Sequence, residues 1–193
     1  MDRSNNRGGT MLRKLNGQVL LDEVSRWLAR TPAILWAHVQ GQARETLNRR
    51  PRQGAWSQAE ILAHLADFEV VCFQARVEQI LRGDPISALN GDQRAGEVPY
   101  AAIEPATALE VFSRERDRSL ARIQQLSPED LTRRTIHREL GELTLASLLT
   151  QWVEHDLSHI RQLVSTAEAV FRPGTEFWRP ASKPTGSSAP ANP

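Results

Sequence analysis

Apolar side chains recur along most of the chain with the period of an amphipathic helix. In the first such segment, residues 18–30, they are Val19, Leu20, Val24, Trp27 and Leu28. The next two residues, Thr31 and Pro32, are of the types preferred at an N-cap and at the first position of a helix. We therefore predict one helix over residues 18–30 and a second from Thr31 to about Leu47.

A capping signal marks the start of the next helix. The stretch WSQAE at residues 56–60 contains the pattern S-x-x-E, in which the serine and the glutamate cap each other's backbone groups. Helical period continues to Leu81 and ends before Gly83. The loop that follows, residues 83–102, is long for a compact helical domain, and such loops are usually lids or mobile segments.

Two more helices complete the predicted fold. A third fits residues 105–126, and a fourth fits Thr144 to about Ala169. The segment DLTRRTIHREL between them has no clear period and is irregular or briefly extended. The fold class is therefore all-α: a four-helix bundle with an extra N-terminal helix and a long loop between helices 2 and 3.

The two ends of the chain lack helical period. Residues 1–17 are rich in glycine, asparagine and arginine, and we predict a flexible N-terminus. Residues 173–193 hold five of the eleven prolines and are predicted to form a tail. A single domain over residues 18–172 remains.

Composition excludes several classes of function. The formal net charge is only +1, and the arginines mix with acids, as in RERDR at residues 114–118, which we interpret as a solvated helix face. This charge pattern does not indicate a nucleic-acid site. A membrane span is not indicated either, because no apolar run approaches the roughly 18 residues that a span needs. The single cysteine, Cys72, and the absence of a signal-peptide pattern predict a cytoplasmic protein.

Three histidines fall on the apolar faces of two predicted helices. At about 100° per residue, His155 and His159 lie about 40° apart, on the side that also carries Trp152. His64 shares its face with Phe68 on the second long helix. All three imidazoles are therefore expected to point into the bundle.

The cost of burial makes a metal site the favoured explanation. A buried polar ring without a partner costs about 1–3 kcal/mol, and three such costs in one small core call for a common partner. Neutral imidazoles are good ligands for divalent zinc, nickel or iron, and three protein ligands leave one coordination position open. We therefore predict a divalent metal, zinc or nickel first and iron as an alternative, on His64, His155 and His159. Whether the two helices touch does not follow from the sequence alone.

The same residues resemble a known family. WSQAEILAHLADFE, followed about ninety residues later by TLASLLTQWVEHDLSHIRQL, is similar to the DinB/YfiT-like superfamily of metal-binding four-helix bundles. The resemblance implies a metal triad at His64, His155 and His159, and a homodimer. It also implies either a hydrolase or a thiol-dependent S-transferase or isomerase that uses a low-molecular-weight thiol such as mycothiol or bacillithiol.

Other polar residues near the triad have open roles. Asp156, at the edge of the same helix face, either orients a ligand histidine or acts as a base, or else makes polar contacts between helices. Gln162 either contacts a ligand histidine or is a polar residue at an interface between helices. Asp67 is expected in a surface salt bridge, and Cys72 as a packing residue.

The stretch HDLSH differs by one residue from the H-E-x-x-H motif of zinc proteases. We reject that interpretation because Asp156 is one methylene shorter than the required glutamate, and no histidine follows His159 to serve as a third ligand.

The sequence thus predicts a metal-dependent enzyme acting on a small molecule, with the metal activating a thiol or a water. The alternative is a non-catalytic metal- or ligand-binding bundle, and a third interpretation is a bundle whose histidines bind nothing. An enzyme needs an open metal face, whereas a binding module can close it with a fourth protein ligand.

Overall fold

The computed structural model describes residues 17–139 and 141–172. The predicted tail at 173–193 and almost all of the predicted flexible N-terminus lie outside these residues. Gly17, which we assigned to the flexible start, is instead the first residue of helix α2. No helix in the described ranges combines the length and the apolar character needed to cross a membrane.

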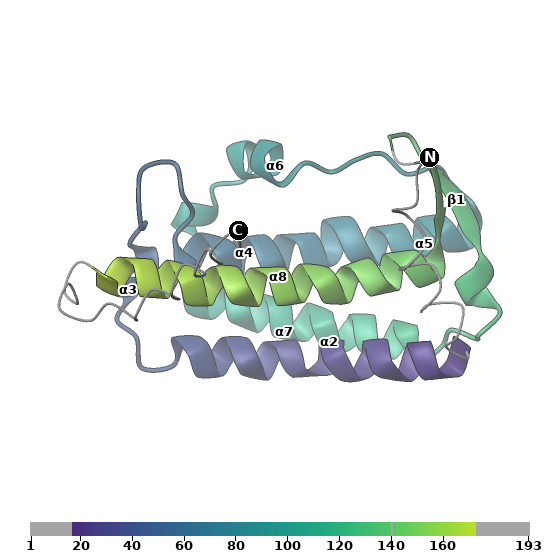
Figure 1. Ribbon diagram of the computed structural model, residues 1–193, viewed down its shortest axis with the longest axis horizontal. Coiled ribbons are helices and arrows are strands. Elements are labelled where there is room, and N and C mark those ends of the chain that lie inside the picture. The colour runs from purple at the N-terminus through teal and green to yellow at the C-terminus, as the bar shows by residue number, and fades with distance from the viewer. Residues whose placement is uncertain (1–16, 140, 173–193) are drawn as a thin grey trace, which may run out of the picture.

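The described residues form four long helical segments, which run side by side along the long axis of the molecule (Figure 1). They are α2 (Gly17–Val39), the continuous run α4 (Gln58–Phe68), η1 (Glu69–Gln74) and α5 (Ala75–Arg82), α7 (Pro105–Ile123), and α8 (Leu145–Phe171). Both α7 and α8 pack against α2 and α4. The predicted four-helix bundle is confirmed.

The predicted helix boundary at Thr31 and Pro32 is wrong, because α2 continues through both residues. The extra N-terminal helix is therefore the first half of α2 and not a separate element. A proline inside a helix leaves the carbonyl four residues earlier without its usual donor. Here that carbonyl belongs to Leu28, and it accepts a hydrogen bond of 2.8 Å from Arg116 Nη1 on α7. A side chain from another helix thus replaces the missing backbone donor.

The second half of the predicted second helix also differs. α2 ends at Val39, and Gly41 follows with a φ of 77°, a left-handed conformation that breaks a helix at little cost for glycine. The short helix α3 (Arg44–Asn48) then leads toward α4.

The capping box before α4 is confirmed. Ser57 Oγ accepts from the Glu60 backbone N–H at 3.2 Å, and the Glu60 carboxylate accepts from the Ser57 backbone N–H at 2.8 Å. The following run is helical to Arg82, close to the predicted end at Leu81. The sequence did not predict that residues 69–74 form a π-helix, an insertion often found at functional sites.

Short elements connect the long helices. The segment DLTRRTIHREL contains strand β1 (Arg134–His137), which pairs antiparallel with β2 (Gly141–Thr144). The long loop after α5 contains helix α6 (Gly91–Glu97) and the 3-10 turn η2 (Tyr100–Ala102). In Figure 1, α6 lies beside the bundle, above α4 and α8.

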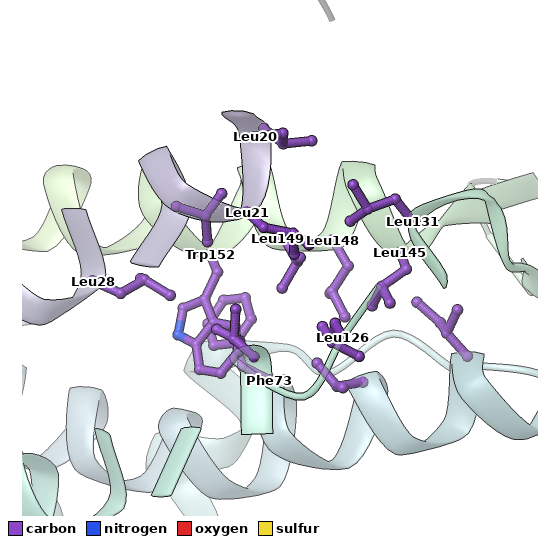
Figure 2. Close-up of a cluster of buried hydrophobic side chains, with 14 of the residues drawn as sticks. Leu20, Leu21, Leu28, Phe73, Leu126, Leu131, Leu145, Leu148, Leu149 and Trp152 are labelled. Atoms are coloured by element: carbon purple, nitrogen blue, oxygen red, sulfur yellow. The ribbon is translucent and has the colours of Figure 1, made fainter. Parts of the chain in front are cut away.

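The bundle core consists of two groups of buried apolar side chains, one toward each end of the helices. In the first group the rings of Phe73 and Trp152 stack with centroids 4.8 Å apart. Figure 2 shows these rings among leucines from α2 and α8. This packing joins η1 to α8, and so it sets the distance between the two helical segments that carry the histidines.

Candidate metal centre

The structure brings the three predicted histidines together. His64 on α4 faces His155 and His159 on α8, and one ring nitrogen of each lies within 4.8 Å of the others. The Nε2 atoms of His64 and His155 are 3.3 Å apart. Within residues 17–139 and 141–172 this is the one group of three such side chains with ligand atoms so close. Helices two and four of the bundle therefore do touch at the predicted place.

Aromatic rings surround the triad. The ring centroid of His64 lies 4.0 Å from that of Phe68 and 4.9 Å from that of Trp56. Phe73 contacts His155 edge-on at 5.0 Å. These rings keep water away from most of the imidazole surface.

Burial keeps the three imidazoles neutral. It lowers the pKa of His64 to about 3 and that of His155 to about 2, and electrostatic repulsion between the rings adds to the effect. The pKa of His159 is lowered too, again mainly by burial. At neutral pH each ring therefore has one nitrogen with a free lone pair, which is the form that binds a metal.

Two ring nitrogens have no partner in the chain. Among the described residues, the buried Nδ1 atoms of His64 and His155 make no hydrogen bond. The nitrogens that converge are the Nε2 atoms, as the 3.3 Å between those of His64 and His155 shows. An ion held between them would leave both Nδ1 atoms as N–H groups, so the fit to a metal rests on the Nε2 atoms. The donor set fits a divalent transition metal, for which neutral imidazole is a common ligand.

Gln162 orients one of the three rings. Its side-chain Oε1 lies 2.7 Å from His159 Nδ1 and accepts the proton of that nitrogen. The proton on Nδ1 leaves Nε2 of His159 as the nitrogen with the lone pair. Of the two roles left open for Gln162, the structure supports the contact with a candidate ligand.

Asp156 makes contacts between helices. Its Oδ2 accepts from Thr31 Oγ1 on α2 at 2.7 Å and from Arg116 Nη1 on α7 at 2.6 Å. Among the described residues, its carboxylate forms hydrogen bonds with these two and with neither histidine of α8. The polar contact between helices is thus the interpretation that the geometry supports.

Arg116 was placed on a solvated face by the pattern RERDR, and this was wrong. Its side chain is fully buried, and all five guanidinium N–H groups have an acceptor. Two donate to Glu69, two to Asp156 and one to the Leu28 carbonyl, at distances of 2.6–3.1 Å. Trp152 Nε1 also donates to Glu69, at 3.1 Å. We call these four side chains, Glu69, Arg116, Trp152 and Asp156, the buried ionic network.

Two carboxylates of the buried ionic network are close in sequence to residues of the triad. Glu69 follows Phe68 at the start of η1, and Asp156 follows His155 on α8. Because Arg116 binds both carboxylates, it fixes η1 against α8 inside the bundle, where all three side chains are buried. The sequence offers one signal for this network, an arginine at a core-facing position of its helix.

Asp67 holds the long loop. Its carboxylate accepts two hydrogen bonds from Arg94 on α6, at 2.8 and 2.9 Å, and one from Tyr100 Oη at 2.7 Å. Although burial raises the pKa of this carboxyl, these donors hold it below its ordinary value. The predicted salt bridge exists, but it is half-buried and ties residues 86–103, which we call the strap, to α4.

The strap lies directly over the triad. A Cβ atom placed on Gly91 would be 3.5 Å from Cε1 of His64 and 3.8 Å from the ring of Phe68. At its other end the strap joins the β-hairpin, since Ile86 N donates to the Ile136 carbonyl at 3.0 Å. The loop that we interpreted as a lid or mobile segment is therefore fastened at both ends.

Asp67→Asn is expected to loosen the strap. An amide keeps the size of the carboxylate but loses the charge that strengthens the hydrogen bonds from Arg94 and Tyr100. Backbone amide exchange in the strap should become at least about tenfold faster, measured by hydrogen exchange with mass spectrometry. Glu97→Gln is the control, because Glu97 is exposed and lies 3.8 Å from the same arginine. Equal exchange in both variants would contradict this role of Asp67.

Two open clefts meet at the triad. The larger cleft encloses about 860 Å³ between η1 and α8. The smaller cleft encloses about 600 Å³ beside the start of α4. Phe68, His155 and His159 line both clefts. The strap contributes Leu89 to the larger and Gly91 to the smaller. The triad is thus accessible from two directions.

Cys72 also lines the larger cleft, but its side chain is buried. Burial raises the pKa of its thiol to about 11, so the thiol stays protonated at neutral pH. These features fit the packing role that the sequence indicated.

Comparison with known proteins agrees with this fold. The family model of the DinB superfamily matches residues 28–163. A protein of Oceanobacillus iheyensis named "Putative metal-dependent hydrolase OB0413" is 23% identical over 155 residues, which are 77% of this chain and 89% of the relative. A solved structure, YfiT from Bacillus subtilis, superposes with a TM-score of 0.69 at 20% identity, covering 80% of this chain and 87% of the other. That structure is described as a probable metal-dependent hydrolase with an unusual four-helix bundle topology. The chain belongs to the DinB superfamily.

Proposed function

We propose that this protein is a metal-dependent hydrolase of a small molecule, with His64, His155 and His159 as the ligands of a divalent ion. Zinc and nickel fit the three imidazoles best, and iron is the alternative. One observation carries the proposal: three neutral imidazoles converge where two open clefts meet. The names of the two compared proteins point to the same chemistry.

The open face favours an enzyme over a binding module. No fourth histidine, cysteine or carboxylate joins the triad among the residues that the structure describes. A divalent ion on three ligands with an open position lowers the pKa of a water or thiol that it binds, and so supplies a nucleophile at neutral pH.

The protein's own residues would prepare the site for this chemistry. Gln162 fixes the tautomer of His159 through the contact at Nδ1. Trp56 and Phe68 shield the His64 ring from solvent, and the strap covers it through Gly91. Such a fixed and partly shielded environment strengthens electrostatic interactions with a reacting group.

A second function is favoured by the pair of clefts. A thiol-dependent S-transferase must hold a low-molecular-weight thiol and an electrophile at the same centre. The two clefts share Phe68, His155 and His159, and each could hold one of these two molecules. A hydrolase needs one substrate and a water, whereas an S-transferase binds two substrates at once. The two functions therefore differ in whether both clefts hold a ligand.

The test begins with the metal content of the purified protein. We expect near-stoichiometric zinc, nickel or iron in the wild type and its loss in His155→Ala and His159→Ala, measured by elemental analysis. His38→Ala is the matched control, because His38 lies on α2 and pairs with Gln58 at 2.8 Å, away from the triad. Removing a ligand nitrogen leaves two donors, which hold a metal far less tightly.

Activity assays on the same proteins then separate the two functions. A panel of small esters and amides tests hydrolysis, and thiol addition to an electrophile tests S-transfer. Either activity should be present in the wild type and in His38→Ala and fall to background in both triad variants. A wild type that carries no metal, and binds none after zinc or nickel is added, would contradict the proposal.

A further inference from the structure

Arginine side chains line both clefts. Among the residues whose side chains the structure describes, the charged residues of the larger cleft are Arg76, Arg161 and Glu154, and that of the smaller cleft is Arg52. Counted over these described side chains, each lining carries a net charge of +1, which equals the net charge of the whole chain with its 24 basic and 23 acidic residues. A bound divalent ion would make this region more positive still.

These guanidinium groups are not neutralised by carboxylates. Within residues 17–139 and 141–172, neither Arg52 nor Arg161 forms an ion pair with an acidic side chain. Arg76 donates to the Ser87 carbonyl at 3.1 Å, and no carboxylate of the described residues pairs with it. By contrast, the arginines of the strap and of the buried ionic network are paired with carboxylates.

The rest of the larger cleft is largely apolar. Phe68, Phe73 and Leu89 line one side, and Leu157 and Ile160 on α8 line the other. An apolar wall with a few arginines suits a ligand whose body is apolar and whose end is an anion. The planar guanidinium matches the geometry of carboxylate and phosphate oxygens, and it forms two parallel hydrogen bonds with them.

We infer that the substrate carries carboxylate or similar oxyanion groups that are held by Arg161 and Arg76 in the larger cleft and by Arg52 in the smaller. The reacting bond then lies between these ends, over the histidine triad. This inference rests on the proposed function, because it names the chemical class of the molecule that the same site accepts.

Binding of simple probes tests the inference without any turnover. Zinc-loaded wild-type protein is titrated calorimetrically with adipate, with its neutral analogue adipamide and with inorganic phosphate. We expect adipate to bind at least about tenfold more tightly than adipamide, which corresponds to one good charged contact. Arg161→Gln and Arg52→Gln should each weaken adipate binding about tenfold and leave adipamide binding unchanged.

Two controls give these measurements their meaning. Arg49→Gln removes an exposed arginine three residues before Arg52 that lines neither cleft, so it reports the effect of net charge alone. Metal content is measured in every variant, because the arginine variants should keep their zinc. Adipate held by the metal alone would bind the arginine variants as tightly as the wild type, and this result would overturn the inference.

The phosphate titration identifies the kind of oxyanion. Arginine-dependent binding of adipate alone supports a carboxylate substrate, and arginine-dependent binding of phosphate alone supports a phosphate ester. Binding of neither, or an equal loss in Arg49→Gln, would overturn the inference. Arginine-dependent binding in a protein that hydrolyses and transfers nothing would contradict the proposed function and leave the oxyanion site standing.

Discussion

Replacing Arg116 with methionine is expected to lower the free energy of unfolding by about 3–5 kcal/mol. The guanidinium is the only described donor that binds both buried carboxylates, Glu69 and Asp156. Methionine fills similar space but leaves two buried carboxylates without their cation, and it leaves the Leu28 carbonyl without a donor. Urea unfolding followed by circular dichroism measures the change as a shift of the midpoint.

The neighbouring residue Arg118 provides the control. Its side chain is 66% exposed and pairs with Glu115, so Arg118→Met should change stability by no more than about 0.5 kcal/mol. A triple variant that replaces Arg116, Glu69 and Asp156 together with apolar residues of similar size should recover much of the loss, since no buried charge then remains. If the triple variant were less stable than Arg116→Met, the cause would be packing and not the unpaired charge.

Mild acid should destabilise the metal-free protein strongly. His64 and His155 have pKa values near 3 and 2 in the folded state, against about 6.5 in the unfolded chain. Below pH 6.5 the unfolded state therefore binds protons that the folded state does not, so stability falls as the pH falls. From pH 7.5 to 4.5 each imidazole that stays neutral when folded costs about 2.7 kcal/mol.

Urea unfolding of metal-free protein at several pH values measures this loss. His64→Phe keeps an aromatic ring among Trp56, Phe68 and Tyr100 but has no group that titrates. Its loss of stability between pH 7.5 and 4.5 should be smaller than that of the wild type by about 2.7 kcal/mol. The same pH dependence in both proteins would mean that His64 is protonated in the folded state as readily as in water.

Local sequence signals were sufficient for most of the fold. The capping box at Ser57 and Glu60 predicted the start of α4 correctly, because both hydrogen bonds form within four residues. The prediction of a helix boundary at Thr31 and Pro32 was wrong for the opposite reason. There the helix continues because of Arg116, which is 84 residues away in the sequence and invisible to a local pattern.

The candidate site shows the same division. His64, His155 and His159 could be identified because helical period places them on apolar faces, where an imidazole is unexpected. The two clefts depend on the position of the strap over α4. The contacts of Asp67 with Arg94 and Tyr100 fix this position. Periodicity predicts which side of a helix is buried, but it does not identify the loop that covers it.

The hydrogen bond from Arg116 to the Leu28 carbonyl makes the first helix dependent on the rest of the bundle. An isolated peptide of residues 17–39 has no such donor, so its proline separates two weakly helical halves. In the nascent chain α2 leaves the ribosome before α7, so we expect α2 to become one continuous helix only when α7 docks against it. Its secondary structure is completed by tertiary contact, in the reverse of the usual order of assembly.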